Sequence, residues 1–147
     1  MNVRMVSASA VLAGFVSLLV VSAPVARAEQ GKLTIELNKL ESQDKNCRAF
    51  FVVGNDTATE YQSLRLDLVL FQPDGIIGRK VAVDLAPLKA SKKVVRLFDL
   101  EGLACDQIGS VLVNDVVECK ATGAAAAGDC LSGTSFSSLA KAPLTTK

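Results

Sequence analysis

The stretch LRLDLVLFQPDG, residues 64–75, decides the fold of this chain. A leucine stands at every second position from residue 64 to residue 70, and a period of two is typical of a strand that buries one face. The Pro-Asp-Gly that follows favours a tight turn, because proline presets a φ of about −65° and glycine accepts a positive φ. The stretch therefore predicts a strand that ends in a hairpin.

The same period of two recurs on both sides of this hairpin. Further strands are expected over residues 33–38, 47–53, 77–85, 93–98 and 108–117. The apolar run at residues 47–53 is continuous, which favours a strand buried on both faces near the middle of a sheet. A short helical turn is expected within residues 100–108. Six or seven short strands at hairpin spacing predict an all-β protein, an antiparallel two-layer β-sandwich.

The first 28 residues have the three parts of a secretory signal peptide. Arg4 supplies a basic start, an apolar run follows over residues 11–21, and the small residues Ala26 and Ala28 favour cleavage after position 28. The alternative is an uncleaved membrane anchor, but a spanning helix needs about 20 predominantly apolar residues and serines interrupt this run. We therefore expect a periplasmic or secreted protein with no membrane insertion after cleavage.

Two segments follow the predicted signal. Residues 29–120 carry the strand pattern and are expected to form the sandwich, whereas residues 121–147 are rich in alanine, glycine and serine and are expected to form a flexible tail. The formal net charge of the whole chain is +1, and removing the predicted signal with its two arginines leaves 14 basic and 15 acidic residues, a net charge of −1. A balance this close to neutral argues against nucleic acid or an anionic membrane surface as the partner, since both require a concentrated basic face.

The chain has four cysteines, Cys47, Cys105, Cys119 and Cys130. An even count in an exported protein predicts two disulfides, with three possible connectivities. A four-thiolate zinc site would need closer paired spacings. Because the second strand of a sandwich starts where an antiparallel fifth strand finishes, we expect a Cys47–Cys105 bond and, by elimination, a Cys119–Cys130 bond that tethers the tail at Cys130.

The segment between residues 52 and 78 resembles the FxLYD-type and related immunoglobulin-like or fibronectin-like domains of bacterial envelope proteins. In those domains a strand ending in an aromatic-acidic pair precedes an Asp-Gly turn and a returning strand. Leu68, Phe71 and Gln72 stand where the family has phenylalanine, tyrosine and aspartate. The resemblance implies an immunoglobulin-like or fibronectin-like sandwich and a binding or scaffolding module rather than an enzyme. It carries over no functional residues.

Catalytic chemistry is sparse in this sequence. There is no histidine, which removes the usual general base and the commonest zinc ligand. The pattern S-x-x-K occurs at Ser42 and Lys45 and again at Ser138 and Lys141, but S-D-N and K-T-G partners and a mixed α/β setting are missing. We therefore expect a protein that is not an enzyme.

No cofactor or metal site is expected either. The loop carboxylates of Asp56, Glu60 and Asp74 do not form the D-x-[DN]-x-[DN]-G run that supplies calcium with enough oxygen ligands. Solvated loop carboxylates explain these residues more simply.

Two functions fit this pattern. The first is a non-catalytic protein-binding or scaffolding module of the bacterial cell envelope, with an envelope or secreted protein as partner and Tyr61 as a candidate surface aromatic. The second is a small periplasmic inhibitor or chaperone-like protein acting on a secreted enzyme through a rigid loop at residues 101–104, with Leu103 as its anchor. The oligomeric state stays open.

Overall fold

The computed structural model describes residues 32–122, 130 and 132–147. Their strands are β1 (Leu33–Gln43), β2 (Asn46–Asn55), β3 (Tyr61–Phe71), β4 (Ile77–Asp84), β5 (Lys92–Leu100), β6 (Ser110–Ala121), β7 (Ser135–Ser138) and β8 (Leu144–Thr146), with a 3-10 turn, η1 (Cys105–Gln107), between β5 and β6. Within this part of the chain, no helix is long and apolar enough to cross a membrane. The predicted signal segment, residues 1–28, lies outside the described residues.

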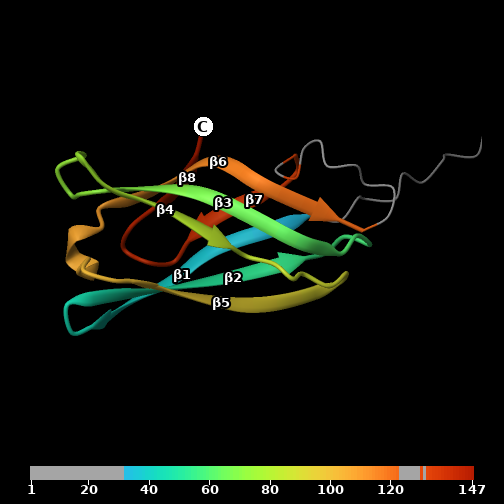
Figure 1. The fold of residues 1–147 in the computed structure, drawn as a ribbon, viewed down its shortest axis with the longest axis horizontal. Coiled ribbons are helices and arrows are strands. Elements are labelled where there is room, and N and C mark those ends of the chain that lie inside the picture. Colours follow the sequence, from blue (N-terminus) through green and yellow to red (C-terminus); the bar gives the residue numbers. More distant parts are fainter. Residues whose placement is uncertain (1–31, 123–129, 131) are drawn as a thin grey trace, which may run out of the picture.

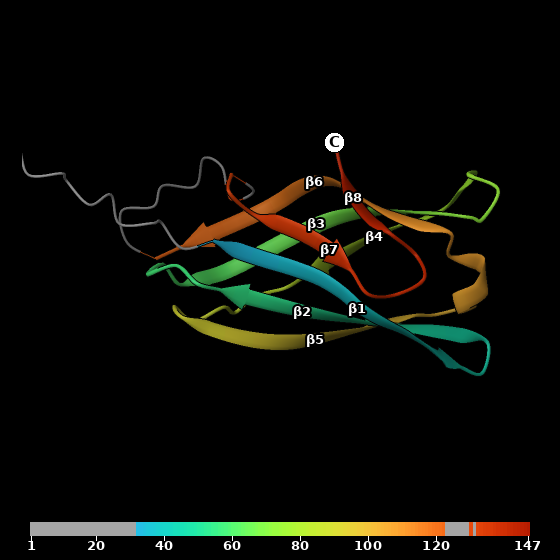
Figure 2. The same cartoon turned by 180° about the vertical axis from the view of Figure 1, so that it is seen from behind.

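The strands form two four-stranded sheets that pack face to face (Figure 1). One sheet has the order β5-β2-β1-β7 and the other has the order β4-β3-β6-β8. Figure 2 shows the same two layers from behind, with β5 again forming one border of its sheet. The prediction of an all-β sandwich is confirmed, with eight strands in place of six or seven, and η1 confirms the expected helical turn.

The core lies between the sheets and is built from alternate residues of the long strands. Leu64, Leu66, Leu68 and Leu70 of β3 are all buried there. Burial of one leucine side chain contributes about 1.5–3 kcal/mol to stability. The alternating leucines of residues 64–70 therefore supply much of the stability of the sandwich. The Pro-Asp-Gly turn forms as expected, since Gly75 has a φ of +86° and its N–H donates to Gln72 O at 2.9 Å.

One detail of the burial prediction is wrong. Strand β2 lies between β1 and β5, in the middle of its sheet as expected, but it is not buried on both faces. Its burial alternates from Asn46 to Val53, and Phe50 and Val52 on the outer face are only partly buried. Because the opposite sheet covers only the inner face of β2, the continuous apolar run leaves apolar side chains on the outside.

The prediction of a flexible tail over residues 121–147 is wrong for its second half. Strand β7 pairs in parallel with β1 and places Phe136 opposite Ile35, and β8 pairs in parallel with β6. Ala142 and Leu144 are buried. A few widely spaced apolar side chains are enough to hold this segment in place, because each of them packs into a core that the longer strands have already formed. Residues 123–129 and 131 lie outside the described part of the chain.

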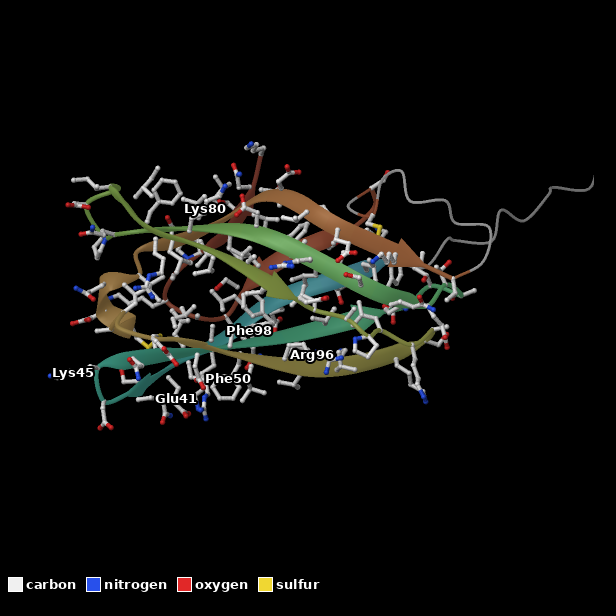
Figure 3. All side chains as sticks on the ribbon, viewed as in Figure 1. Glu41, Lys45, Phe50, Lys80, Arg96 and Phe98 are labelled. Carbon is white, nitrogen blue, oxygen red and sulfur yellow. A yellow bond between two sulfur atoms is a disulfide. The ribbon has the colours of Figure 1, made fainter. Side chains whose placement is uncertain are left out.

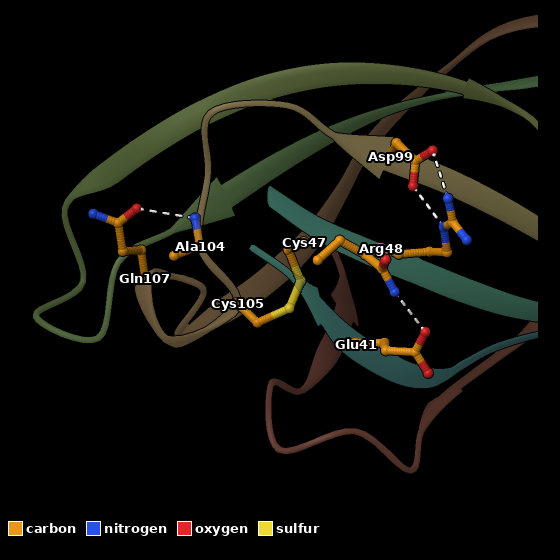
Figure 4. Close-up of a disulfide and its surroundings, with 8 residues drawn as sticks. Glu41, Cys47, Arg48, Asp99, Ala104, Cys105 and Gln107 are labelled. Carbon is orange, nitrogen blue, oxygen red and sulfur yellow. Dashed lines mark hydrogen bonds and ion pairs between the residues drawn. A yellow bond between two sulfur atoms is a disulfide. The ribbon is translucent and has the colours of Figure 1, made fainter. Parts of the chain in front are cut away.

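Both predicted disulfides are confirmed. The bond between Cys47 and Cys105 joins the start of β2 to η1 and spans 58 positions (Figure 4). The bond between Cys119, near the end of β6, and Cys130 spans 11 positions. Among the described residues no cysteine is free. Two disulfides fit a protein that folds in an oxidising compartment outside the cytoplasm.

Substituting alanine for both cysteines of the Cys47–Cys105 bond should lower the free energy of unfolding by about 4 kcal/mol, because the stabilisation grows with the length of the closed loop. The same change at the shorter Cys119–Cys130 bond should lower it by about 3 kcal/mol. Urea unfolding of the two double variants measures both losses. A larger loss for the shorter loop would contradict the loop-closure account.

Leu144→Ala should lower the free energy of unfolding by about 2–4 kcal/mol, since the side chain is only 7% exposed and fills the core. Leu139→Ala is the matched control, because Leu139 lies on the same segment, is 71% exposed, and should change stability by less than about 0.5 kcal/mol. Equal effects of the two variants in thermal or urea unfolding would show that the segment is a tail after all.

Candidate functional site

Three loops meet at the end of the sandwich that carries η1. They are the turn between β3 and β4, η1 itself, and the loop between β7 and β8 (Figure 2). The Cys47–Cys105 bond holds η1 against β2, and the Gln107 side chain accepts the Ala104 N–H at 3.1 Å (Figure 4). Gly109 then approaches the β3–β4 turn so closely that a Cβ there would lie 2.6 Å from Gln72 O. The region of η1 and the β3–β4 turn are therefore fixed relative to one another.

A cleft of about 660 Å³ opens between these loops. Leu40 and Ile108 supply apolar lining, and Gln72, Asp106 and Lys141 supply polar lining. The cleft thus offers apolar contact together with groups that can hydrogen-bond or pair with a charge, the combination that orients a bound ligand or segment.

The polar side chains of the cleft are available to a ligand. Within the described residues, the side chains of Gln72, Asp106 and Lys141 make no hydrogen bond or ion pair. Lys39 also lines the cleft, but its amino group forms an ion pair with Glu41 and lies 5.1 Å from the centre of the Phe50 ring. Lys141 and Asp106 are therefore the charges that a bound group would meet.

Ser138 holds the wall of the cleft that the β7–β8 loop forms. Its hydroxyl lies 2.7 Å from the carbonyl oxygen of Ala142 and 3.3 Å from those of Leu37 and Ala140. This serine belongs to one of the two S-x-x-K patterns, and its contacts with backbone carbonyls tie the loop to β1. Leu139, the next residue, is turned outward and lines the cleft from an exposed position.

The structure does not bring the two predicted partner-binding residues together. Tyr61 begins β3 at the far end of the sandwich, where its backbone pairs with Leu88 and its side chain packs half-buried against the core. Leu103 lies near η1, but it also packs half-buried against the core. Contact of either residue with a partner stays a prediction. Sequence reasoning missed Leu139 as a site residue and considered Lys141 only within an S-x-x-K pattern, because it assigned their loop to a tail.

The loop carboxylates lie apart. Asp56 and Glu60 precede β3, whereas Asp74 follows it at the opposite end of the sandwich. Within the described part of the chain, no group of three or more acidic or thiol side chains has the arrangement to hold a metal ion.

A second surface feature is an apolar strip on the outer face of β2 and β5, made of Phe50, Val52, Val95 and Leu97. Val52 lies opposite Val95, and Phe50 lies opposite Leu97. Val95 and Leu97 are 52% and 50% exposed. Figure 3 shows Phe50 on this outer side, beside Glu41. The four side chains adjoin one another, and contiguous apolar patches, rather than single exposed residues, are the feature that marks interaction surfaces.

An ion pair bounds the apolar strip at one end. Arg48 Nε donates to Asp99 Oδ1 at 2.6 Å, and Nη2 donates to Asp99 Oδ2 at 3.0 Å (Figure 4). These hydrogen bonds from the Arg48 guanidinium lower the pKa of Asp99 and raise the pKa of Arg48. Asp99 is therefore a fixed negative charge on the outer edge of β5 at neutral pH.

A polar network covers the outer face of the other sheet. Asp67, in the middle of β3, is buried and accepts hydrogen bonds from Asn114 Nδ2 at 2.8 Å and Lys80 Nζ at 2.9 Å (Lys80 is labelled in Figure 3). The hydrogen bond from Asn114, and after it that from Lys80, lowers the pKa of Asp67 below its ordinary value of 3.8. This network is explained by the folded structure and needs no ligand.

The lowered pKa of Asp67 predicts a pH dependence of stability. The carboxylate is stabilised only in the folded chain, so its contribution to the free energy of unfolding is complete above the ordinary value of 3.8 and is lost as the pH falls through the lowered pKa. Asp67→Asn should therefore lower stability at neutral pH and flatten its decline below about pH 4. Urea unfolding across a pH series tests this, and an equally steep decline below about pH 4 in the Asp67→Asn variant would contradict it.

Comparisons with known proteins identify no family. No family model matches the chain, and no curated protein matches it. A solved structure of IrmA from Escherichia coli aligns with a TM-score of 0.48 and 12% sequence identity, covering 73% of this chain and 92% of that chain. A likeness at this level carries no functional residue and no activity from IrmA to this chain.

Proposed function

We propose that this chain is an exported, non-catalytic protein-binding or scaffolding module of the bacterial cell envelope, and that the cleft beside η1 receives a segment of its partner. Two disulfides support export, since such bonds persist outside the cytoplasm. The absence of histidine from the sequence and the use of the Ser138 hydroxyl to hold a loop support a binding role over a catalytic one.

The observation that carries the proposal is the pre-formed cleft. Its volume of about 660 Å³ lies within the range of ligand-binding pockets. A disulfide, the hydroxyl of Ser138 and the close approach of Gly109 hold its three walls. Since the walls are already ordered, a partner that enters the cleft loses less free energy to ordering than it would on mobile loops.

The lining residues describe the segment that fits. Leu40 and Ile108 favour an apolar side chain inside the cleft, and Lys141 favours a carboxylate beside it. Leu139, which lines the cleft, and the exposed Ile76, which follows the lining residue Gly75, add further apolar contact. An apolar anchor surrounded by polar groups is the arrangement that concentrates binding energy in protein interfaces. An exposed loop or chain terminus with an apolar residue near an acidic one would meet all of these groups.

Site-specific photo-cross-linking in the producing cells tests the proposal. A photoreactive phenylalanine analogue at Leu139 or at Ile76 should give an adduct with the same protein, because both positions flank the cleft. The matched control is Val117, which is 59% exposed on β6 and lies outside the cleft. Adding Lys141→Glu to the Leu139 variant should weaken binding about tenfold, since it places a carboxylate against the acidic partner group.

Circular dichroism of each variant shows whether the sandwich is intact. The proposal fails if the three positions give the same adducts, if Leu139 and Ile76 give none, or if Lys141→Glu leaves the yield unchanged in an intact protein.

A further inference from the structure

The four edge strands of the sandwich differ in how well they are protected from pairing with another chain. Strands β7 and β8 have only four and three residues. Strand β4 has a register irregularity against β3 and carries small or charged residues on its outer face. Strand β5 has nine residues, pairs with β2 without any register shift, and has no strand on its other side among the described residues. Long, regular and apolar edges are the ones that pair with other strands.

The outer face of β5 carries a charge pattern around its half of the apolar strip. From residue 93 to residue 99 the outward side chains are Lys93, Val95, Leu97 and Asp99. A positive charge thus stands at one end of the exposed aliphatic pair and a negative charge at the other. When such a strand is laid antiparallel to a copy of itself, each charge meets its opposite.

We propose that β5 pairs antiparallel with β5 of a second copy of this chain, about a two-fold axis at Arg96, so that the two sheets containing β5 merge into one. Lys93 then lies opposite Asp99 of the second copy, and Val95 lies opposite Leu97 of the second copy. By symmetry, each of these pairs forms twice. Opposite charges and aliphatic pairs across neighbouring strands both stabilise a sheet.

The charge pattern selects this register over its neighbours. Residues opposite each other must point to the same face, so the register can change only in steps of two. A step in one direction places Val95 opposite Asp99, and a step in the other places Lys93 opposite Leu97. Each alternative replaces a matched pair by a charge against an aliphatic side chain. The axis at Arg96 is therefore the register that satisfies all four outward residues.

The inner face of β5 is compatible with the same register. A groove of about 440 Å³ runs between β4 and β5 and is lined by Val81, Val83 and Phe98. Val94 of the second copy would lie opposite Phe98 and cover part of this groove. Arg96, labelled in Figure 3, meets its own copy on the axis. Its guanidinium, however, donates to Leu85 O at 3.0 Å and to Pro87 O at 2.8 Å within its own chain.

Charge reversal tests the pairing. In sedimentation velocity over a range of concentrations, the unmodified protein should dimerise. Lys93→Asp or Asp99→Lys should each raise the dimer dissociation constant about tenfold, because like charges then face each other twice. The double variant K93D/D99K should recover the original constant. Since Asp99→Lys and the double variant both lose the ion pair with Arg48, the recovery cannot come from that contact.

Cross-linking tests the register itself. Val95→Cys and Leu97→Cys chains should form an intermolecular disulfide when mixed, because the two positions face each other. Either variant alone should form little intermolecular disulfide. In the proposed register, position 95 of one copy lies two residues away from position 95 of the other. Lys141→Glu, in the cleft, should change neither result, so this inference and the proposed function are tested separately.

A protein that stays monomeric at every concentration, charge reversals without effect, or equal cross-linking of the unmixed chains would overturn the proposal. The proposal would also be overturned if the protein were a monomer that binds an extended peptide at β5.

Discussion

The constraint on which this structure depends is that each long strand has an apolar face that must be covered. Such strands are stable only when a second sheet covers the apolar face, so two layers form and the leucines of β3 lie between them. Within the described residues, no buried side-chain nitrogen or oxygen lacks a hydrogen-bond partner. What remains for function is therefore the part that the layers leave uncovered: the loops at the ends, the outer faces and the edges.

The features that could be predicted from the sequence are those with a strong local signal. The alternation of leucines placed β3, the Pro-Asp-Gly turn placed its hairpin, and the meeting of β2 with β5 placed Cys47 beside Cys105. Strands β7 and β8 have too few residues for alternation to be visible. They form because β1 and β6 already offer open edges, which is a property of the folded sheets and not of residues 135–146 themselves.

The candidate cleft was still harder to predict from local sequence. Each of its walls comes from a different part of the chain, and the wall with Leu139 and Lys141 belongs to the segment expected to be a tail. Local sequence around Ser138 offers no sign that its hydroxyl reaches the carbonyl of Leu37. The β2 part of the apolar strip, by contrast, was visible in the sequence as the continuous apolar run of that strand. Its exposure was not, because which face of a strand is covered depends on the second layer.

The parallel pairing of β7 with β1 has a consequence for the order in which the molecule is completed. Thr34 lies opposite Ser135, so β1 acquires its last neighbour only when a segment about a hundred positions later in the chain is available. A chain that emerges from a pore beginning with its amino terminus exposes the open side of β1 throughout that passage. Contacts this distant in sequence slow the final closure, and the bare strand is vulnerable to mispairing until it occurs.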